Sequence, residues 1–154
     1  MENTENKALA IMKAHIGHKF PNNPSKLGAW LEGTILEAEE GMLVAEYLVR
    51  PEMTNGIGTL HGGAIAAILD DQMGATIVSL GAPNFYTTVN LIVDYFYPSV
   101  AGDVVTAKTS MVKRGKQIQN VQCELWNLKT NKLLAKGTSN LLRIDVPVKH
   151  SSQG

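Results

Sequence analysis

The 154-residue chain is long enough for one domain with a substantial hydrophobic core, and its 14 basic and 14 acidic residues cancel to a formal net charge of zero. That balance argues against general nucleic-acid binding, which usually needs a basic excess. The single Cys123 excludes an internal disulfide framework. Because the N-terminal stretch also lacks the apolar core of a secretory signal, we expect a cytoplasmic protein.

The front of the chain predicts a short amphipathic helix over residues 3–19, where apolar side chains recur at three- and four-residue spacings. The segment Pro21–Pro24 ends it. No second set of ligands accompanies His15 and His18, so no metal site is expected there. We expect residues 1–29 to form an N-terminal helix and loop extension. A single domain over 30–145 and a polar, frayed tail over 146–154 complete the expected organisation.

Most of the remaining chain predicts β-strands. Residues 30–37 and 42–49 form a hairpin through Gly41, and alternating apolar residues mark four later strands joined by short turns, at 85–97, 104–112, 118–128 and 133–144. One of these turns is basic, Lys113-Arg114-Gly115-Lys116. The pattern predicts an α+β protein, a curved antiparallel sheet wrapped around one long central helix. One sheet edge stays open, and pairing with a second copy is an economical way to close it.

The central helix is predicted by the apolar run from Ala64 to Leu80, which follows a glycine-rich turn and the sequence His61-Gly62-Gly63. Apolar side chains point in nearly every direction around it, so the helix is expected to be buried. Its length approaches that of a membrane span. The adjacent carboxylates of Asp70 and Asp71 argue against lipid, where each costs roughly 2.5–3.5 kcal/mol.

The two aspartates are candidates for chemistry because a carboxylate in apolar surroundings has a raised pKa unless it is paired. Adjacent residues on a helix point about 100° apart, so only one of Asp70 and Asp71 is expected to line a given site. The alternative is that one of them faces solvent or caps an element across an interface.

Two glycines at a helix start cost helix propensity, but they leave backbone N–H groups bare at the positive end of the helix dipole. Such a turn stabilises an anion, including the oxyanion formed when a carbonyl is attacked. The alternative for Gly62 and Gly63 is a tight turn with close packing, and for His61 a structural role.

Spacing separates the two candidate groups. Gly62 and Asp70 are eight residues apart, roughly 12 Å along a helix axis. One chain therefore cannot bring both to the same carbonyl. Two antiparallel copies of the helix can, with Gly62 of one facing Asp70 of the other, so the spacing predicts at least a dimer if both groups are catalytic.

Several of these residues together resemble a known family. The run Asn55-x-x-Gly58-x-x-His61-Gly62-Gly63, with Asp70 behind it, looks like the hotdog-fold acyl-CoA thioesterases of the phenylacetic-acid-pathway (PaaI-type) group. The strand from Thr87 to Tyr95, the basic turn and the order of elements fit the same pattern. The resemblance covers residues 30 to 144, most of the chain. It leaves residues 1–29 outside the shared core, where they can cover or shape the site.

The resemblance implies a role for each matching position. Asp70 matches the catalytic carboxylate, a general base on water or a nucleophile, with Asp71 as the second choice. Gly62 matches the backbone donor to the thioester carbonyl, and His61 helps to hold that turn. Asn55 matches a residue that places the thioester or the water, and Thr88 falls where relatives carry a hydroxyl or amide.

The resemblance also implies the partners. The segment Lys113, Arg114, Gly115 and Lys116 matches the one that runs beside the CoA moiety of the substrate. No other cofactor and no metal are implied, and relatives are dimers, commonly paired into tetramers. Two other readings stay open: an acyl-CoA hydratase or dehydratase on the same fold, and a non-catalytic acyl-CoA-binding protein. For the acyl group, the sequence suggests an apolar pocket lined by Met53, Ile57, Leu60, Met73 and Ile77.

Overall fold

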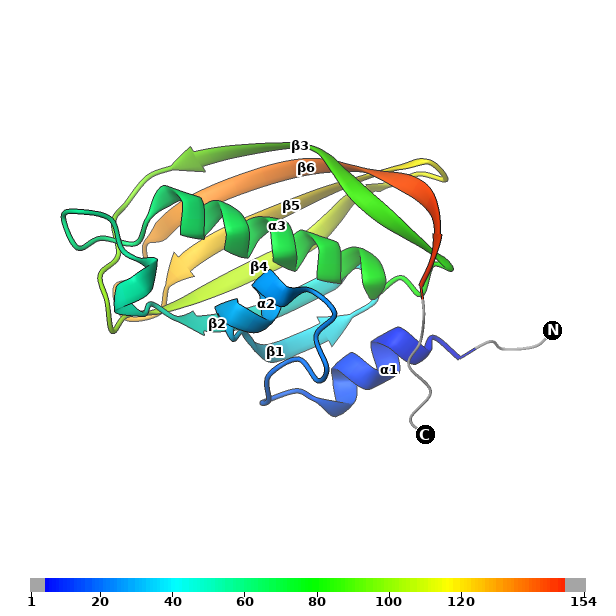
Figure 1. Ribbon diagram of the computed structural model, residues 1–154, viewed down its shortest axis with the longest axis horizontal. Helices are drawn as coiled ribbons and strands as arrows, with labels where there is room; N and C mark the ends of the chain where they lie inside the picture. The colour runs from blue at the N-terminus through cyan, green and yellow to red at the C-terminus, as the bar shows by residue number, and fades with distance from the viewer. Residues whose placement is uncertain (1–4, 149–154) are drawn as a thin grey trace.

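A six-stranded antiparallel sheet curves around one long helix in the computed structural model, which describes residues 5–148 (Figure 1). The curved antiparallel sheet around one helix is as the sequence pattern predicted, and it is the hotdog fold that the resemblance implies. The elements in chain order are α1 (Lys7–Ala14), α2 (Lys26–Leu31), β1 (Thr34–Glu39), β2 (Met42–Leu48), the 3₁₀ turn η1 (Pro51–Met53), α3 (Gly62–Val78), β3 (Asn84–Tyr95), β4 (Val104–Arg114), β5 (Ile118–Asn127) and β6 (Leu133–Pro147).

The strands lie in the order β1-β2-β4-β5-β6-β3, so the two outer strands are β1 and β3. The edge of β1 is covered by the preceding chain, because the Gly17 N–H donates to the Ile35 carbonyl at 2.7 Å and the Ile35 N–H donates to the His18 carbonyl at 3.0 Å. The other edge strand, β3, pairs with β6 on its inner side. Its exposed side chains include Val89 and Ile92. The sheet thus has one uncovered edge among the described residues.

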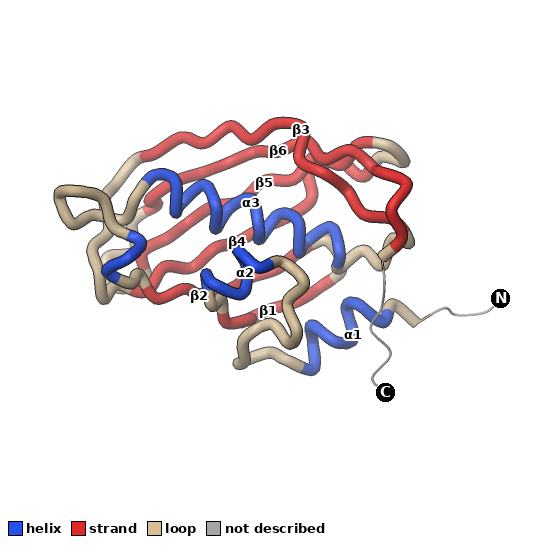
Figure 2. Tube along the Cα trace, viewed as in Figure 1, coloured by secondary structure: helices blue, strands red, loops and turns tan. Residues whose placement is uncertain are grey.

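Helix α3 lies across the concave face of the sheet (Figure 2). Its inner face is buried by Ile65, Ile68, Leu69, Met73 and Ile77, each at most 5% exposed, which join the main core. Burying these side chains stabilises the fold by about 1.5–3 kcal/mol each. The burial predicted for this helix is confirmed on the inner face. No helix within residues 5–148 is long and apolar enough to cross a membrane.

The outer face of α3 is different, because Gly63, Ala66, Asp70 and Gly74 recur there at three- and four-residue spacings and are partly or fully exposed. The sequence suggested a helix enclosed by protein on all sides. In the described chain a stripe of small residues instead stays accessible, and Asp70 lies within it.

The N-terminal region differs from the expectation in its details. The strand expected from Trp30 begins only at Thr34, because Ser25 caps α2 and that helix runs to Leu31. The next residue, Glu32, has a left-handed φ of 57°. Of the helix expected over 3–19, residues 3 and 4 lie outside the described residues, and within 5–19 helix α1 covers only Lys7–Ala14. At the other end β6 continues to Pro147, past the expected start of the tail, and residues 149–154 of that tail lie outside the described residues.

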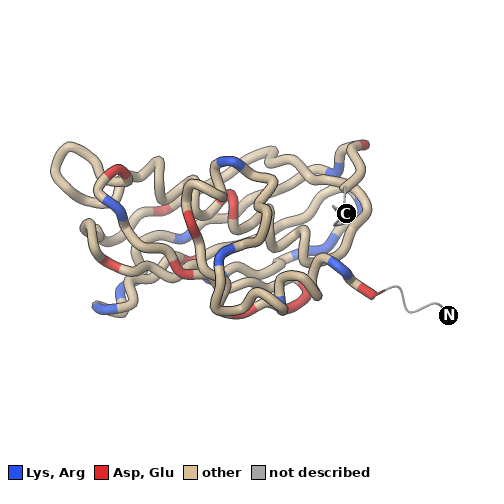
Figure 3. Tube along the Cα trace, turned by 60° about the horizontal axis from the view of Figure 1, so that its bottom comes forward, with Lys and Arg blue, Asp and Glu red and all other residues tan. Residues whose placement is uncertain are grey.

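Helix α1 packs beside the C-terminal half of α3, where a second apolar cluster forms around Met12, Ile35 and Leu43. Lys, Arg, Asp and Glu are interspersed over the described chain (Figure 3), in keeping with the zero net charge.

Candidate functional site

The loop before α3 is held by the side chain of Asn55. Its Oδ1 accepts hydrogen bonds from the N–H groups of Ile57 (3.2 Å) and Thr59 (3.1 Å), and its Nδ2 donates to Thr59 Oγ1 at 2.8 Å. Gly58 adopts a φ of +81°, which favours glycine. Asn55 therefore shapes this loop, and it retains one amide hydrogen for another acceptor.

His61 is the N-cap of α3, where its Nδ1 accepts a hydrogen bond from the Gly63 N–H at 2.8 Å. With Nδ1 accepting, the neutral ring carries its proton on Nε2. The Tyr95 hydroxyl donates to the Gly62 carbonyl at 3.0 Å. Within residues 5–148, no hydrogen bond engages the Gly62 N–H. This donor stands at the positive end of a 17-residue helix, where an anion is favoured.

Asp70 lies two turns further along the same helix and is hydrogen-bonded to β3. Its Oδ1 accepts from Thr88 Oγ1 at 2.8 Å, and Thr88 is exposed. Within the described chain its Oδ2 has no hydrogen-bond partner. The structure thus brings together Asp70 and Thr88, which are 18 residues apart in sequence. One oxygen of the carboxylate is oriented by the hydroxyl and the other is accessible.

Asp71 points to a different neighbour, the N-terminal region. Its Oδ1 accepts a hydrogen bond from Ser25 Oγ at 2.8 Å. Burial raises the pKa of the Asp71 carboxyl, the Ser25 hydrogen bond opposes that rise, and the nearby Asp70 charge adds to it. The two adjacent acids therefore have different surroundings, as their 100° separation predicts.

A cavity of about 480 Å³ lies against the C-terminal half of α3, a size within the usual range for small-molecule sites. Asp70 and Thr88 are on its wall. The other lining residues, mostly apolar, come from α1 and the loop after it, from α3, from β3 with the turn before it, and from the C-terminal strand: Met12, Phe20, Asn23, Pro24, Ser25, Asp71, Gly74, Ala75, Ile77, Val78, Ala82, Asn84, Phe85, Tyr86, Leu141 and Val148.

The residues expected to line an apolar acyl pocket do not lie together in this cavity. Met53, Leu60 and Met73 are in the main core at 5% exposure or less, and Ile57 is 85% exposed at the tip of its loop. Of the five expected residues only Ile77 lines the cavity.

Sequence reasoning missed the cavity residues of the N-terminal region, although it expected that region to shape a site. Ser25 carries a local signal, since a serine before a helical run is a favoured N-cap. Its pairing with Asp71, 46 residues later, has no sequence signature.

The basic turn lies at the junction of β4 and β5. Arg114 is engaged with the β1–β2 turn, because its Nη1 is 2.7 Å from Glu40 Oε1 and its Nη2 donates to the Glu40 carbonyl. Lys113 and Lys116 are exposed. The turn also contacts the cavity wall, since the Tyr86 hydroxyl donates to the Lys116 carbonyl. Gln119 Nε2 donates both to that hydroxyl and to the Gly115 carbonyl, the latter at 2.9 Å.

The structure does not bring all the candidates together in one chain. Gly62 and Asp70 are at separate places along one helix, and the Asn55 side chain forms hydrogen bonds within its own loop.

Of the two N-terminal histidines, His15 bonds to the Ile11 carbonyl through Nδ1. Among residues 5–148 no three His, Cys, Asp or Glu side chains gather as a metal site would require.

Comparison with known proteins gives one consistent result. A family model described as the thioesterase superfamily matches residues 57–134. Acyl-coenzyme A thioesterase 13 of Homo sapiens is 33% identical over 106 residues, which are 68% of this chain and 74% of that protein. Acyl-coenzyme A thioesterase PaaI of Escherichia coli is 28% identical over 93 residues, 60% of this chain and 65% of that protein.

Solved structures show the same fold. The E. coli PaaI protein of the phenylacetic acid degradation operon superposes with a TM-score of 0.79 at 23% identity, over 93% of this chain and 97% of that chain. A hypothetical thioesterase from Streptococcus pneumoniae, solved with coenzyme A, superposes with a TM-score of 0.70 at 21% identity, over 75% and 88% of the two chains.

Proposed function

The chain belongs to the thioesterase superfamily and is a thioester hydrolase, and we propose that it hydrolyses an acyl-CoA to a free acid and CoA. The observation that carries the proposal is Asp70, an accessible carboxylate oriented by Thr88 on the wall of a largely apolar 480 Å³ cavity. The thioesterase from S. pneumoniae that was solved with coenzyme A shares this fold, which supports CoA as the leaving group.

We propose that Asp70 acts through its free oxygen. As a general base it takes a proton from water, the resulting hydroxide bonds to the thioester carbon, and the carbonyl oxygen becomes an oxyanion. The oxyanion collapses, the C–S bond breaks, and the CoA thiolate leaves and takes up the proton held by Asp70. As a nucleophile, Asp70 instead forms an anhydride and expels the CoA thiolate, and water then hydrolyses the anhydride. In both cases Thr88 keeps the carboxylate in position.

The oxyanion needs a donor that Asp70's own subunit does not offer nearby. We propose that the Gly62 N–H of a partner subunit supplies it, with His61 and Asn55 holding the turn that presents it. By two-fold symmetry, Gly62 of each helix can face Asp70 of the other only if the helices cross at the midpoint, Ala66.

Two features support this dimer. Ala66 lies within the accessible stripe of small residues on α3, where a second helix can approach closely. The uncovered edge of β3 exposes Val89 and Ile92, which a second copy of the sheet would cover. We also propose that two such dimers pair to form a tetramer.

The CoA moiety is assigned to the basic turn beside Tyr86. Lys113 and Lys116 are exposed and suited to phosphate oxygens, whereas Arg114 must leave Glu40 to do the same. The proposed chemistry uses no cofactor apart from the substrate's CoA and no metal. We propose the cytoplasm as its location, in keeping with the free, buried thiol of Cys123.

The first experiment measures thiol release from acetyl-, hexanoyl-, palmitoyl-, phenylacetyl- and benzoyl-CoA. The proposal expects release of free CoA from at least one of them. A hydratase would consume an enoyl-CoA while the thioester stays intact, and a binding protein would retain acyl-CoA without turnover. Either result would replace the proposed function.

The second experiment tests the shared site. Ala66→Cys places a thiol at the proposed two-fold axis, so mild oxidation should give a covalent dimer. Lys13→Cys, on the exposed side of α1, is the matched control and should stay unlinked. A chain that is monomeric by light scattering and active in that state would refute the shared site.

A further inference from the structure

One wall of the cavity is separate from the hotdog sheet. Phe20, Asn23, Pro24 and Ser25 line the cavity from the loop between α1 and α2, opposite Gly74 and Ile77 of α3. Most of the remaining wall is α3 or strand, whose backbones are fixed by helix or sheet hydrogen bonds, with Met12 of α1 and Ala82 of the turn before β3 beside them. This loop is held by a small number of contacts, so its position depends on them.

The two ends of the N-terminal region are each held by hydrogen bonds to the rest of the protein. At the front, Asn6 Nδ2 donates to the Ser79 carbonyl at 2.8 Å. At the back, the Arg50 guanidinium donates to the Trp30 and Leu31 carbonyls and lies over the Trp30 ring. Between them, within residues 5–148, Ser25 to Asp71 is the single side-chain hydrogen bond that joins residues 20–25 to α3.

The surroundings of Asp71 suit it to hold residues 20–25 against α3. Ser25 donates to its Oδ1 and at the same time accepts the Gly28 N–H at 2.9 Å as the cap of α2. A Cβ on Gly28 would be 2.6 Å from Asp71 Oδ2 and 2.7 Å from Asn23 Nδ2, so only glycine lets the helix approach this closely. The carboxylate is thus enclosed by Ser25, Asn23 and the Gly28 backbone.

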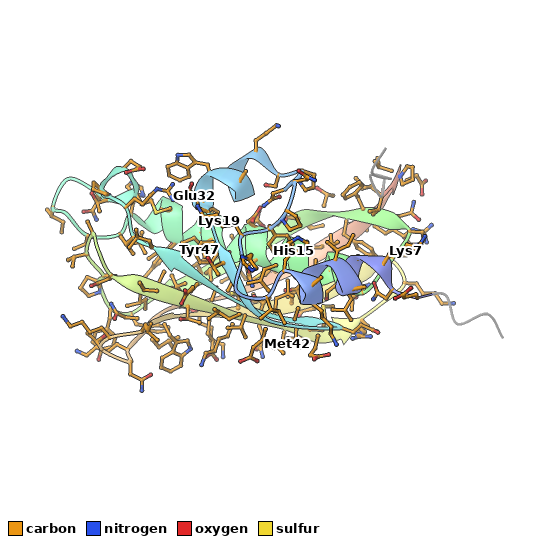
Figure 4. All side chains as sticks on the ribbon, turned by 90° about the horizontal axis from the view of Figure 1, so that it is seen from below. Lys7, His15, Lys19, Glu32, Met42 and Tyr47 are labelled. Atoms are coloured by element: carbon orange, nitrogen blue, oxygen red, sulfur yellow. The ribbon has the colours of Figure 1, made fainter. Side chains whose placement is uncertain are left out.

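The other side of Asp71 borders a second cavity of about 270 Å³, lined also by Lys19, Glu32 and Tyr47. These three residues lie near one another when the molecule is seen from below (Figure 4). Lys19 Nζ is 3.2 Å from Glu32 Oε1. The loop therefore has open space on both sides of the Asp71 contact. Apart from that contact, the loop is held on this side by Phe20, which packs against the same apolar cluster as Ala75 and Val78 of α3.

We propose that residues 20–25 form an acyl-selecting wall and that Asp71 is the positioning residue that fixes it through Ser25. The inference rests on the proposed acyl-CoA hydrolysis. The adjacent acids then divide two tasks: Asp70 faces the reacting carbon, and Asp71 holds the wall that limits which acyl group reaches it. Loosening the wall widens the cavity, so larger acyl groups become better substrates relative to smaller ones.

The test compares Ser25→Ala, which removes the donor, with Lys26→Ala, an exposed change one residue further along the same helix. Hydrogen exchange of the amides in 20–31 is measured together with kcat/KM for palmitoyl-CoA and hexanoyl-CoA. Ser25→Ala should accelerate exchange and raise the palmitoyl-to-hexanoyl ratio by about tenfold, the scale of discrimination by an apolar pocket. Lys26→Ala should change neither.

Three further variants test the wall and its positioning residue separately. Phe20→Ala should raise the same ratio directly, by removing side-chain volume from the wall. Asp71→Asn keeps an oxygen that can accept from Ser25, so it should retain the wild-type ratio, whereas Asp71→Ala should behave like Ser25→Ala.

The outcomes are distinct. If the wild type releases CoA and Ser25→Ala leaves the ratio unchanged, the inference fails while the proposed function stands. If the wild type cleaves no acyl-CoA, the proposed function fails by itself. If exchange in 20–31 is the same in Ser25→Ala and Lys26→Ala, Asp71 is not the anchor, whatever the activity.

Discussion

The two ends of helix α3 are built in different ways. At the N-terminal end, residues 55–63 are shaped by contacts within the loop itself: Asn55 bonds to Thr59, and His61 bonds to Gly63. At the C-terminal half, the helix meets chain that is far away in sequence, with Asp70 bonded to Thr88 and Asp71 bonded to Ser25. The N-terminal end presents a backbone donor, and the middle of the helix presents a carboxylate beside a cavity.

The difference separates two requirements of the proposed reaction. A local turn fixes N–H groups at a helix start with little help from the rest of the protein. A selective cavity needs walls from several elements, so its shape depends on the whole fold. Because Gly62 and Asp70 of one helix are too far apart to act on one carbonyl, the reaction as proposed joins the donor end of one subunit to the cavity of another.

The largest effect is expected at the cavity end, from Asp70→Asn. This change keeps the shape but removes the base or nucleophile, so kcat for thiol release should fall by about 10²–10⁴-fold. Asp71→Asn is the matched control on the neighbouring residue, and its loss should stay within about tenfold, since the Ser25 contact can persist. If Asp71→Asn is the more damaging change, the roles of the two acids are reversed.

A smaller effect is expected from Thr88→Val, which removes the hydroxyl that donates to Asp70 and keeps the side-chain shape. One hydrogen bond to a charged group is worth about 1.5–3 kcal/mol when buried and less at an exposed site, so kcat should fall by about tenfold. Thr88→Ser keeps the donor and should retain most of the activity. Equal rates for the valine and serine variants would mean that the hydroxyl does not orient the carboxylate.

These contrasts also explain how far the sequence could predict the protein. The central helix, the antiparallel strands and the fold class followed from periodicity and glycine turns, which are local. In the strand predicted over 118–128, the alternating apolar residues Val121, Cys123 and Leu125 all face the core. The errors occurred where helix and strand signals compete over a few residues, as at Trp30 and Leu31, which end a short helix instead of starting a strand.

In the candidate site too, the features that depend on neighbouring residues could be predicted and the others could not. The helix cap at His61 could be anticipated, because it depends on residues next to one another. The cavity could not, because Ser25 and Phe20 reach it by folding across α3. Apolar residues near Asp70 in sequence were expected to line the pocket, but Met73 points into the sheet, since neighbouring helix positions face different directions. No pattern in one sequence states which side of a helix an N-terminal loop will cover.

At the donor end, His61→Ala tests whether the histidine acts as a cap. Loss of the Gly63 contact should lower the free energy of unfolding by about 1 kcal/mol, the usual value of an N-cap. His61→Asn restores a side-chain acceptor and should recover both stability and thiol release. Urea unfolding and the release assay on the two variants decide the matter. Recovery of stability without recovery of activity would assign the imidazole a role in the chemistry.

The smallest expected effect concerns Asp71 and pH. Burial raises the pKa of this carboxyl above its ordinary value of 3.8, so the folded chain holds the proton more tightly than the unfolded chain does. Between 3.8 and the raised value the folded state carries more protons, and its contribution to stability falls as pH rises through that window. Below the window both states are protonated and the contribution is complete.

Asp71→Asn removes this titration and leaves the other groups in place. The wild-type free energy of unfolding, measured relative to the variant in urea, should therefore increase as pH is lowered from 7 toward 4. A difference that stays constant over this range would mean that Asp71 is solvated like an ordinary surface acid. Such a carboxylate would not be enclosed by the N-terminal region, and the contrast between the two ends of α3 would then rest on Asp70 and Thr88 alone.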